Sequence, residues 1–177
     1  GVGKSSINRS VGIATVMAQA GMFVACSSFE YKPYTAIYTR ILGNDNIFKG
    51  LSTFAVEMCE MATITNKCDE NSLVLGDEVC SGTETASAIA IFVQTLIKLN
   101  SLKCSHIFAT HFHELTDKED ILKLDRLVMK HMVVEYDPGT DSLIYNRKLQ
   151  NGSGTRLYGL EVCKSLAMPK EFLDLAN

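Results

Sequence analysis

The chain has 177 residues, of which 46% are hydrophobic and 21% charged, an ordinary composition for one globular domain with a sizeable core. Its net charge of −3 argues against a surface that coats nucleic acid, because neutralising phosphates needs clustered lysine and arginine. The six cysteines form no C-x-x-C pair, so zinc spacing is absent and free thiols in a reducing compartment are expected. No apolar run reaches the ~18 residues of a membrane span.

Helix-like and strand-like runs alternate along the chain, which is the pattern of a parallel sheet covered by helices. The first run is a helix over residues 5–20, where apolar side chains recur at helical spacing until Gly21. The next predicted elements are a short strand over 22–26, a helix over 53–65, a strand over 72–75, a helix over 84–99 and a strand over 106–110. A hairpin of 132–136 and 143–148, a helix over 160–168 and a last helix from Pro169 complete the order.

The chain opens on Gly-Val-Gly-Lys-Ser-Ser, the second half of a phosphate-binding loop. A complete loop has the pattern G-x-x-x-x-G-K-[ST], follows a strand and opens a helix. Here the first glycine and its strand are missing, so we expect the sequence to begin inside the loop. Lys4 would place its charge on the β- and γ-phosphates, and Ser5 would hold Mg²⁺. The triplet alone is also compatible with an ordinary surface helix start.

Two neighbouring carboxylates, Asp77 and Glu78, follow the apolar strand over 72–75. P-loop ATPases present a Mg²⁺-linked aspartate at such a strand end, and an adjacent glutamate can polarise the attacking water. Taken alone, the pair could be a strand-end turn. Together with Gly3-Lys4-Ser5 it predicts a nucleotide site.

His111 ends the next predicted strand, where a polar residue can sense the γ-phosphate. His113 and Glu114 follow, but their spacing is not H-E-x-x-H, so a helix start is favoured over a metal site. Ser52 and the segment 81–84 each precede a predicted helix and are candidate caps or phosphate contacts.

Further motifs accompany these residues, and the segments 52–58 and 108–111 among them are much more specific than the phosphate loop. The motifs are Thr39-Arg40-Ile41-Leu42-Gly43, Ser52-Thr53-Phe54-Ala55-Val56-Glu57-Met58, Ser81-Gly82-Thr83, Phe108-Ala109-Thr110-His111 and Tyr158-Gly159-Leu160. The string resembles, over nearly the whole chain, the ATPase domain of MutS, the DNA mismatch-recognition family. The segment 44–50 and Gly76 look most like the MutS branch of giant viruses and octocoral mitochondria.

The resemblance implies an α/β fold of the P-loop NTPase, ABC-type class, with a largely parallel sheet, helices on its faces and a hairpin near the C-terminus. It implies a single ATPase domain over 1–177 that uses ATP and Mg²⁺. It also implies roles for individual residues. Asp77 and Ser5 would bind Mg²⁺, Glu78 would be the general base, and His111 would be a switch that responds to the γ-phosphate. Ser52 would contact the nucleotide of the partner subunit, and Gly82 and Thr83 would lie in a loop that joins the two sites. The phosphates would be bound by Gly1, Val2, Gly3, Lys4, Ser5 and Ser6.

The resemblance further implies a dimer, mismatched double-stranded DNA bound through domains absent from this chain, and an intracellular location with DNA. Cys80-Ser81 stands where the family more usually has Gly-Arg, and Leu157 where it has Ser. Another ABC-type ATPase is an alternative, although Ser52-Thr53-Phe54 lacks the S-G-G-Q type of signature. A non-catalytic dimerisation module is the second alternative, and the isolated chain is expected to be poorly stable because a central strand would be missing.

Overall fold

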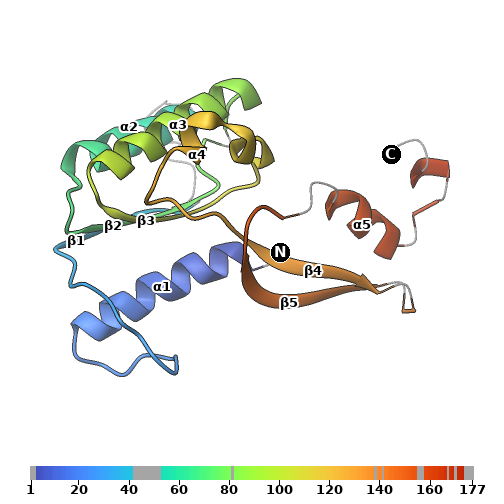
Figure 1. Ribbon diagram of the computed structural model, residues 1–177, viewed down its shortest axis with the longest axis horizontal. Helices are drawn as coiled ribbons and strands as arrows, with labels where there is room; N and C mark the ends of the chain where they lie inside the picture. The colour runs from blue at the N-terminus through green and yellow to red at the C-terminus, as the bar shows by residue number, and fades with distance from the viewer. Residues whose placement is uncertain are drawn as a thin grey trace. The chain divides into compact units, whose positions relative to one another are not determined.

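The computed structural model divides the chain into two compact units, one over residues 4–127 and one over 128–177 with 1–3 (Figure 1). It describes residues 3–41, 53–80, 82–137, 139–140, 142–154, 158–166, 168–169 and 171–173.

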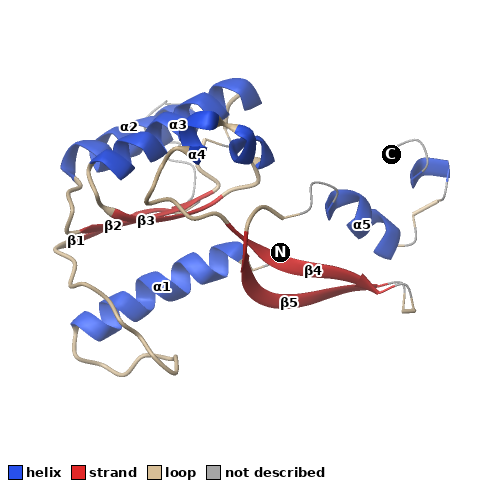
Figure 2. Ribbon diagram, in the orientation of Figure 1, coloured by secondary structure: helices blue, strands red, loops and turns tan. Residues whose placement is uncertain are grey.

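The larger unit is a three-stranded parallel sheet between two layers of helices. The strand order is β1 (Ala36–Arg40), β2 (Ser72–Asp77) and β3 (Ser105–Ala109), and every residue of the central β2 is buried. Helix α1 (Lys4–Gln19) covers one face, whereas α2 (Thr53–Lys67), α3 (Thr85–Ser101) and α4 (Glu119–Leu122) cover the other (Figures 1 and 2). The strands are parallel, so their carboxyl ends meet at one edge, where open α/β sheets bind ligands.

The core of this unit includes the most deeply buried side chains of β2 and α3. Leu73, Val74 and Leu75 on the strand are at most 3% exposed, and Phe92 and Leu99 on the helix are at most 1% exposed. An unbroken apolar run is what a strand buried on both faces requires.

Helix α1 approaches β2 closely at Gly12, where an added Cβ would lie 2.8 Å from Leu75 Cδ1. The fully buried side chains of α1 are polar, namely Asn8 and Thr15. Thr15 donates its hydroxyl to the carbonyl of Val11 within the helix. The apolar Val11 of the same helix is only half-buried.

The smaller unit contains the antiparallel hairpin β4 (Lys130–Asp137) and β5 (Ser142–Asn151), and α5 (Tyr158–Ser165) lies against β5. Asp137 holds the turn, because its Oδ1 accepts the Gly139 N–H at 2.9 Å and its Oδ2 accepts the Thr140 hydroxyl at 2.7 Å. These bonds, that of Thr140 foremost, lower the pKa of Asp137. The predicted hairpin is confirmed.

The helices and strands predicted between residues 53 and 110 are confirmed, with bounds that differ by a few residues from those expected. The predicted helix over 160–168 ends earlier, at Ser165. Residues 171–173 are helical, and Leu173 N–H reaches the carbonyl of Pro169. None of the helices in the described ranges is long and apolar enough to cross a bilayer.

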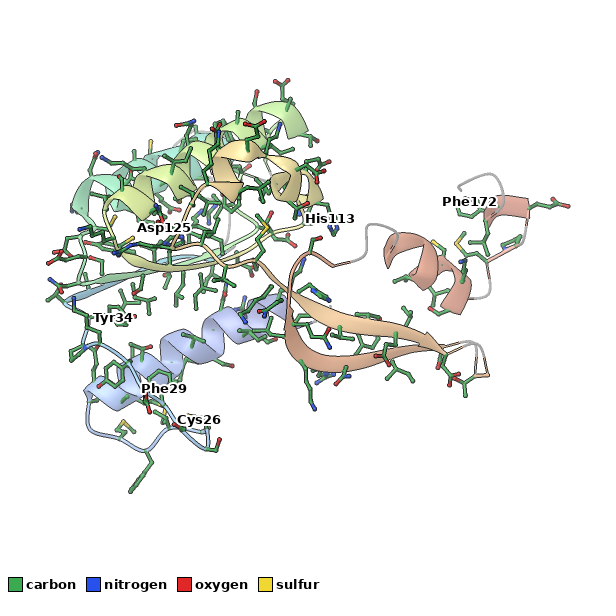
Figure 3. All side chains as sticks on the ribbon, viewed as in Figure 1. Cys26, Phe29, Tyr34, His113, Asp125 and Phe172 are labelled. Carbon is green, nitrogen blue, oxygen red and sulfur yellow. The ribbon has the colours of Figure 1, made fainter. Side chains whose placement is uncertain are left out.

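The strand predicted over 22–26 is wrong. This segment has no strand structure, and Met22 and Phe23 are 58% and 99% exposed. Figure 3 labels Cys26, Phe29 and Tyr34 along the connection from α1 to β1. The strand that the sequence analysis did not predict, β1, follows this connection and pairs with β2.

Candidate functional site

Helix α1 begins against the carboxyl ends of two strands. The Lys4 ammonium donates to the carbonyl of Thr110, the residue directly after β3, at 3.1 Å. One turn later, the Asn8 side-chain amide donates to the carbonyl of Gly76 in β2 at 2.6 Å. Gly3, just before the helix, has a φ of 102°, a conformation that glycine adopts without steric cost. The first two turns of α1 are therefore fixed on the strand ends.

Asp77 is the last residue of β2 and lies beside Ala109 in the register of β3. The Asp77 residue is 5% exposed, and its Oδ1 has no hydrogen-bond partner among the residues that the structure describes. Glu78 follows, half-buried, and its N–H donates to the carbonyl of Ala109 at 2.8 Å. A buried carboxylate oxygen without a partner is costly, so this one is suited to a cation.

Beyond β3 the chain turns at Thr110, whose hydroxyl accepts the N–H of Phe112 at 3.1 Å. Phe112 is buried, with its ring 6.3 Å from that of Phe92. Phe112 is buried while the preceding residue, His111, is exposed, and the centroids of the two rings lie 4.7 Å apart. The expected helix start at His113 is confirmed as a 3₁₀ helix over His113–Asp117.

The structure thus brings four predicted site residues to one edge of the sheet. Lys4 faces the end of β3, Asp77 ends β2 with Glu78 directly after it, and His111 lies two residues beyond β3. Ser5 and Ser6 occupy the first turn of α1. Gly1, Val2 and Ser52 lie outside the described residues.

Gly82 and Thr83 lie in the loop before α3. An added Cβ at Gly82 would lie 3.4 Å from the Cβ of Phe54 on α2, so this loop runs against that helix. The segment 81–84 was expected to cap α3, and the cap position lies within it. The cap position is Glu84, which makes no side-chain bond to the backbone there and instead accepts the Ser87 hydroxyl at 2.6 Å.

The residues around Asp77 fit a hard divalent cation. Mg²⁺ takes one or two protein oxygens and keeps phosphates and water as its other ligands. The orphaned Asp77 Oδ1 supplies such an oxygen. The hydroxyl of Ser5, next to Lys4 in the first turn of α1, is the second candidate.

Three further residues that shape this site, Asn8, Arg40 and Glu57, were not expected from the sequence. Arg40 and Glu57 lie inside motifs that had been noted without a role. A polar side chain one turn after the lysine was the available signal for Asn8, because residues at i and i+4 share one helix face.

A lysine at a helix start, set against two parallel strands of which one ends in Asp-Glu, defines the class of P-loop ATPase domains. The family model described as MutS domain V matches residues 1–177. The chain therefore belongs to the MutS domain V family.

Similar proteins carry names of the same kind. A mutS homolog of Acanthamoeba polyphaga mimivirus, named for DNA mismatch repair, is 45% identical over 99% of this chain and 16% of its own length. The mitochondrial DNA mismatch repair protein mutS homolog of Sarcophyton glaucum is 39% identical over 99% and 17%. DNA mismatch repair protein MutS of Finegoldia magna is 38% identical over 99% and 20%. The chain spans a fifth or less of the length of these relatives.

Proposed function

We propose that this chain is the ATPase part of a DNA mismatch repair protein, in which ATP binding and hydrolysis drive a conformational cycle. The family and the names of the relatives support this class of function. One observation carries the ATPase assignment: the Lys4 ammonium lies on the end of β3, next to the strand whose last residue, Asp77, keeps a buried carboxylate oxygen without a partner. The similarity to the mimivirus and Sarcophyton glaucum relatives favours the branch of the family found in giant viruses and octocoral mitochondria.

In this proposal Lys4 binds the β- and γ-phosphates, and the Thr110 carbonyl that it contacts orients the ammonium. Gly1, Val2, Gly3 and Ser6 complete the phosphate loop. Ser5 and Asp77 hold Mg²⁺, which when bound neutralises charge that develops on the phosphates.

Glu78 is the proposed general base. It stands directly after the Mg²⁺-binding aspartate, and the bond from its N–H to Ala109 fixes its backbone at the strand end. A carboxylate within reach of the attacking water would take up its proton as the water oxygen bonds to the γ-phosphorus, the bond from that phosphorus to the bridging oxygen breaks and ADP leaves. His111, exposed just beyond β3, is the proposed sensor of the γ-phosphate.

The proposed assembly is a dimer in which Ser52 reaches the partner's nucleotide, and Gly82 and Thr83 belong to the loop between the two sites. Mismatched double-stranded DNA is bound by other parts of the full-length protein. The proposed location is the cell interior, in a compartment that contains DNA, as the mimivirus and mitochondrial relatives suggest.

Two substitutions in the full-length protein test the ATPase assignment. Glu78→Gln keeps the size of the side chain but removes the base, so hydrolysis should slow on the order of 10²–10⁴-fold while ATP affinity is kept. Lys4→Ala should weaken nucleotide binding itself. Glu119→Gln is the matched control, because Glu119 is an exposed carboxylate that pairs with Lys123. This substitution should leave turnover unchanged. Wild-type turnover in Glu78→Gln would remove Glu78 from this role, and unchanged affinity in Lys4→Ala would refute the phosphate contact.

A further inference from the structure

A buried carboxylate on α2 is bonded to the segment that carries the proposed base. Glu57 is 4% exposed, and its Oε1 accepts the N–H of Cys80 at 2.9 Å. Cys80 comes two residues after Glu78 and is fully buried. A helix on one face of the sheet thereby holds the backbone just beyond the end of β2.

The negative charge of Glu57 is paired with the guanidinium of Arg40, the last residue of β1. Arg40 places its Nε 3.7 Å from Glu57 Oε1 and 3.1 Å from Glu60 Oε2. Arg40 lies beside Gly76 in the register of β1 and β2, so this pairing takes place next to the strand end. A buried carboxylate is costly unless it is paired, and the arginine meets that requirement.

The segment that Glu57 holds is strained. Glu78 and Cys80 have φ values of 50° and 67°, in the left-handed region that non-glycine residues rarely adopt. Such residues persist only where the surrounding structure holds them. Two bonds do so here: one from Glu78 N–H to the Ala109 carbonyl, and one from Cys80 N–H to Glu57.

We propose that Glu57 is a positioning residue for Glu78, which it aims by fixing the strained backbone through the Cys80 N–H. The assignment rests on the proposed function, because it takes Glu78 as the base. Ser52, the proposed contact to the partner's nucleotide, directly precedes α2 in the chain. Because Glu57 of α2 bonds to Cys80, a shift of this helix would also move the segment that carries Glu78.

The test compares two substitutions of Glu57 in the full-length protein. Glu57→Gln keeps an oxygen that can accept the Cys80 N–H, whereas Glu57→Leu removes it. We expect kcat to fall on the order of 10–100-fold in Glu57→Leu and to stay within about threefold in Glu57→Gln, because a misplacement of about 1 Å costs on that order. The affinity for ATP, measured by titration of a fluorescent analogue, should stay within about threefold in both.

Glu60→Gln is the matched control, since Glu60 pairs with the same Arg40 but is largely exposed and has no bond to the Cys80 segment among the described contacts. Its kcat should equal that of the wild type. If the Glu57→Leu variant does not fold, the double variant Arg40→Met/Glu57→Leu takes its place. It replaces both members of the buried charge pair with apolar side chains, a change that folded proteins often accommodate without loss of stability. The kcat of this double variant should fall as expected for Glu57→Leu.

A merely structural role would lower the yield of folded protein but leave turnover per bound nucleotide unchanged, and that result would overturn the proposal. An equal fall in Glu57→Gln and Glu57→Leu would also overturn it. Hydrogen exchange at the Cys80 amide separates this inference from the proposed function. Faster exchange in Glu57→Leu is expected whether or not the wild type hydrolyses ATP, and unchanged exchange would contradict the bond.

Discussion

The side-chain amide of Asn8 donates a buried hydrogen bond of 2.6 Å to the carbonyl oxygen of Gly76. Asn8 lies one helical turn after Lys4, and Gly76 directly precedes Asp77. This single bond therefore fixes the helix that carries the proposed phosphate ligand to the strand that carries the proposed metal ligand.

Asn8→Ala should loosen that junction. The substitution leaves the Gly76 carbonyl without this donor and opens a small cavity, so we expect the local free energy of unfolding to fall by about 1–3 kcal/mol. Hydrogen exchange of the α1 and β2 amides in the full-length protein measures the effect. Asn66→Ala, at an exposed position of α2, is the control. Equal exchange in Asn8→Ala and Asn66→Ala would contradict the prediction.

Gly76→Ala should destabilise β2 and β3. A Cβ at Gly76 would meet the Phe108 ring and would lie 3.1 Å from Val79 Cγ2. The Phe108 ring cannot yield easily, because it packs edge-on against the buried Phe92 at 5.4 Å. We expect a loss of about 1–3 kcal/mol, the usual cost of overpacking a core.

Gly159→Ala is the matched control for Gly76→Ala. Gly159 lies in α5, and an added Cβ there would meet nothing within 4 Å. The same substitution should be neutral or stabilise α5 by about 0.5–1 kcal/mol, because alanine favours helices. The expected contrast is faster hydrogen exchange in β2 and β3 for Gly76→Ala and unchanged or slower exchange in α5 for Gly159→Ala. Similar small effects at both sites would show that the clash at Gly76 is relieved.

Much of this fold could be predicted because its signals are local. The apolar run 73–75 ends in charged residues, which places a buried strand and a site at its end. The turn around Asp137 is specified by side chains that bond neighbouring backbone within a few residues. The triplet Gly3-Lys4-Ser5 likewise combines a helix start with a phosphate ligand in adjacent residues.

The parts of the fold and site that the sequence did not predict depend on contacts between residues that lie far apart in the chain. The apolar run 22–26 has the composition of a strand, yet Phe23 is exposed, because composition does not supply a neighbouring strand. Arg40 and Glu57 meet only because α2 packs on β1, so neither residue alone predicts the pair. The burial of Asn8 depends in the same way on a carbonyl 68 residues away.

Asp77→Asn should raise the Mg²⁺ requirement of ATP turnover. The amide keeps the shape of the side chain but loses the charge that makes the buried oxygen a strong ligand for a hard cation. We expect the Mg²⁺ concentration at half-maximal turnover to rise on the order of tenfold or more. Titration of Mg²⁺ at fixed ATP in the full-length protein measures this shift.

Asp125→Asn is the control for Asp77→Asn, since Asp125 is exposed on the connection between α4 and β4 (Figure 3). Its Mg²⁺ titration should superimpose on that of the wild type. A superimposable curve for Asp77→Asn would remove Asp77 from the set of metal ligands.

The stability of β3 should decrease in acid because of His106. Burial lowers the pKa of this side chain below its ordinary value of 6.5, against a smaller opposing effect of the Cys104 carbonyl, which lies 3.2 Å from Nδ1. The folded state therefore keeps His106 neutral where the unfolded chain already binds a proton. As the pH falls through 6.5 toward the folded pKa, the unfolded state binds more protons and stability is lost, by at most about 1.4 kcal/mol per pH unit for one group.

The His106→Gln variant isolates this contribution, because glutamine stays neutral over the whole range. Hydrogen exchange of the β3 amides at pH 7.5 and 5.5, corrected for the intrinsic exchange rate, gives the local free energy of unfolding. We expect the wild type to lose more of this free energy than His106→Gln between the two pH values. An equal loss would mean that the folded and unfolded states protonate His106 alike, which the burial of the imidazole beside Phe108, with ring centroids 5.9 Å apart, argues against.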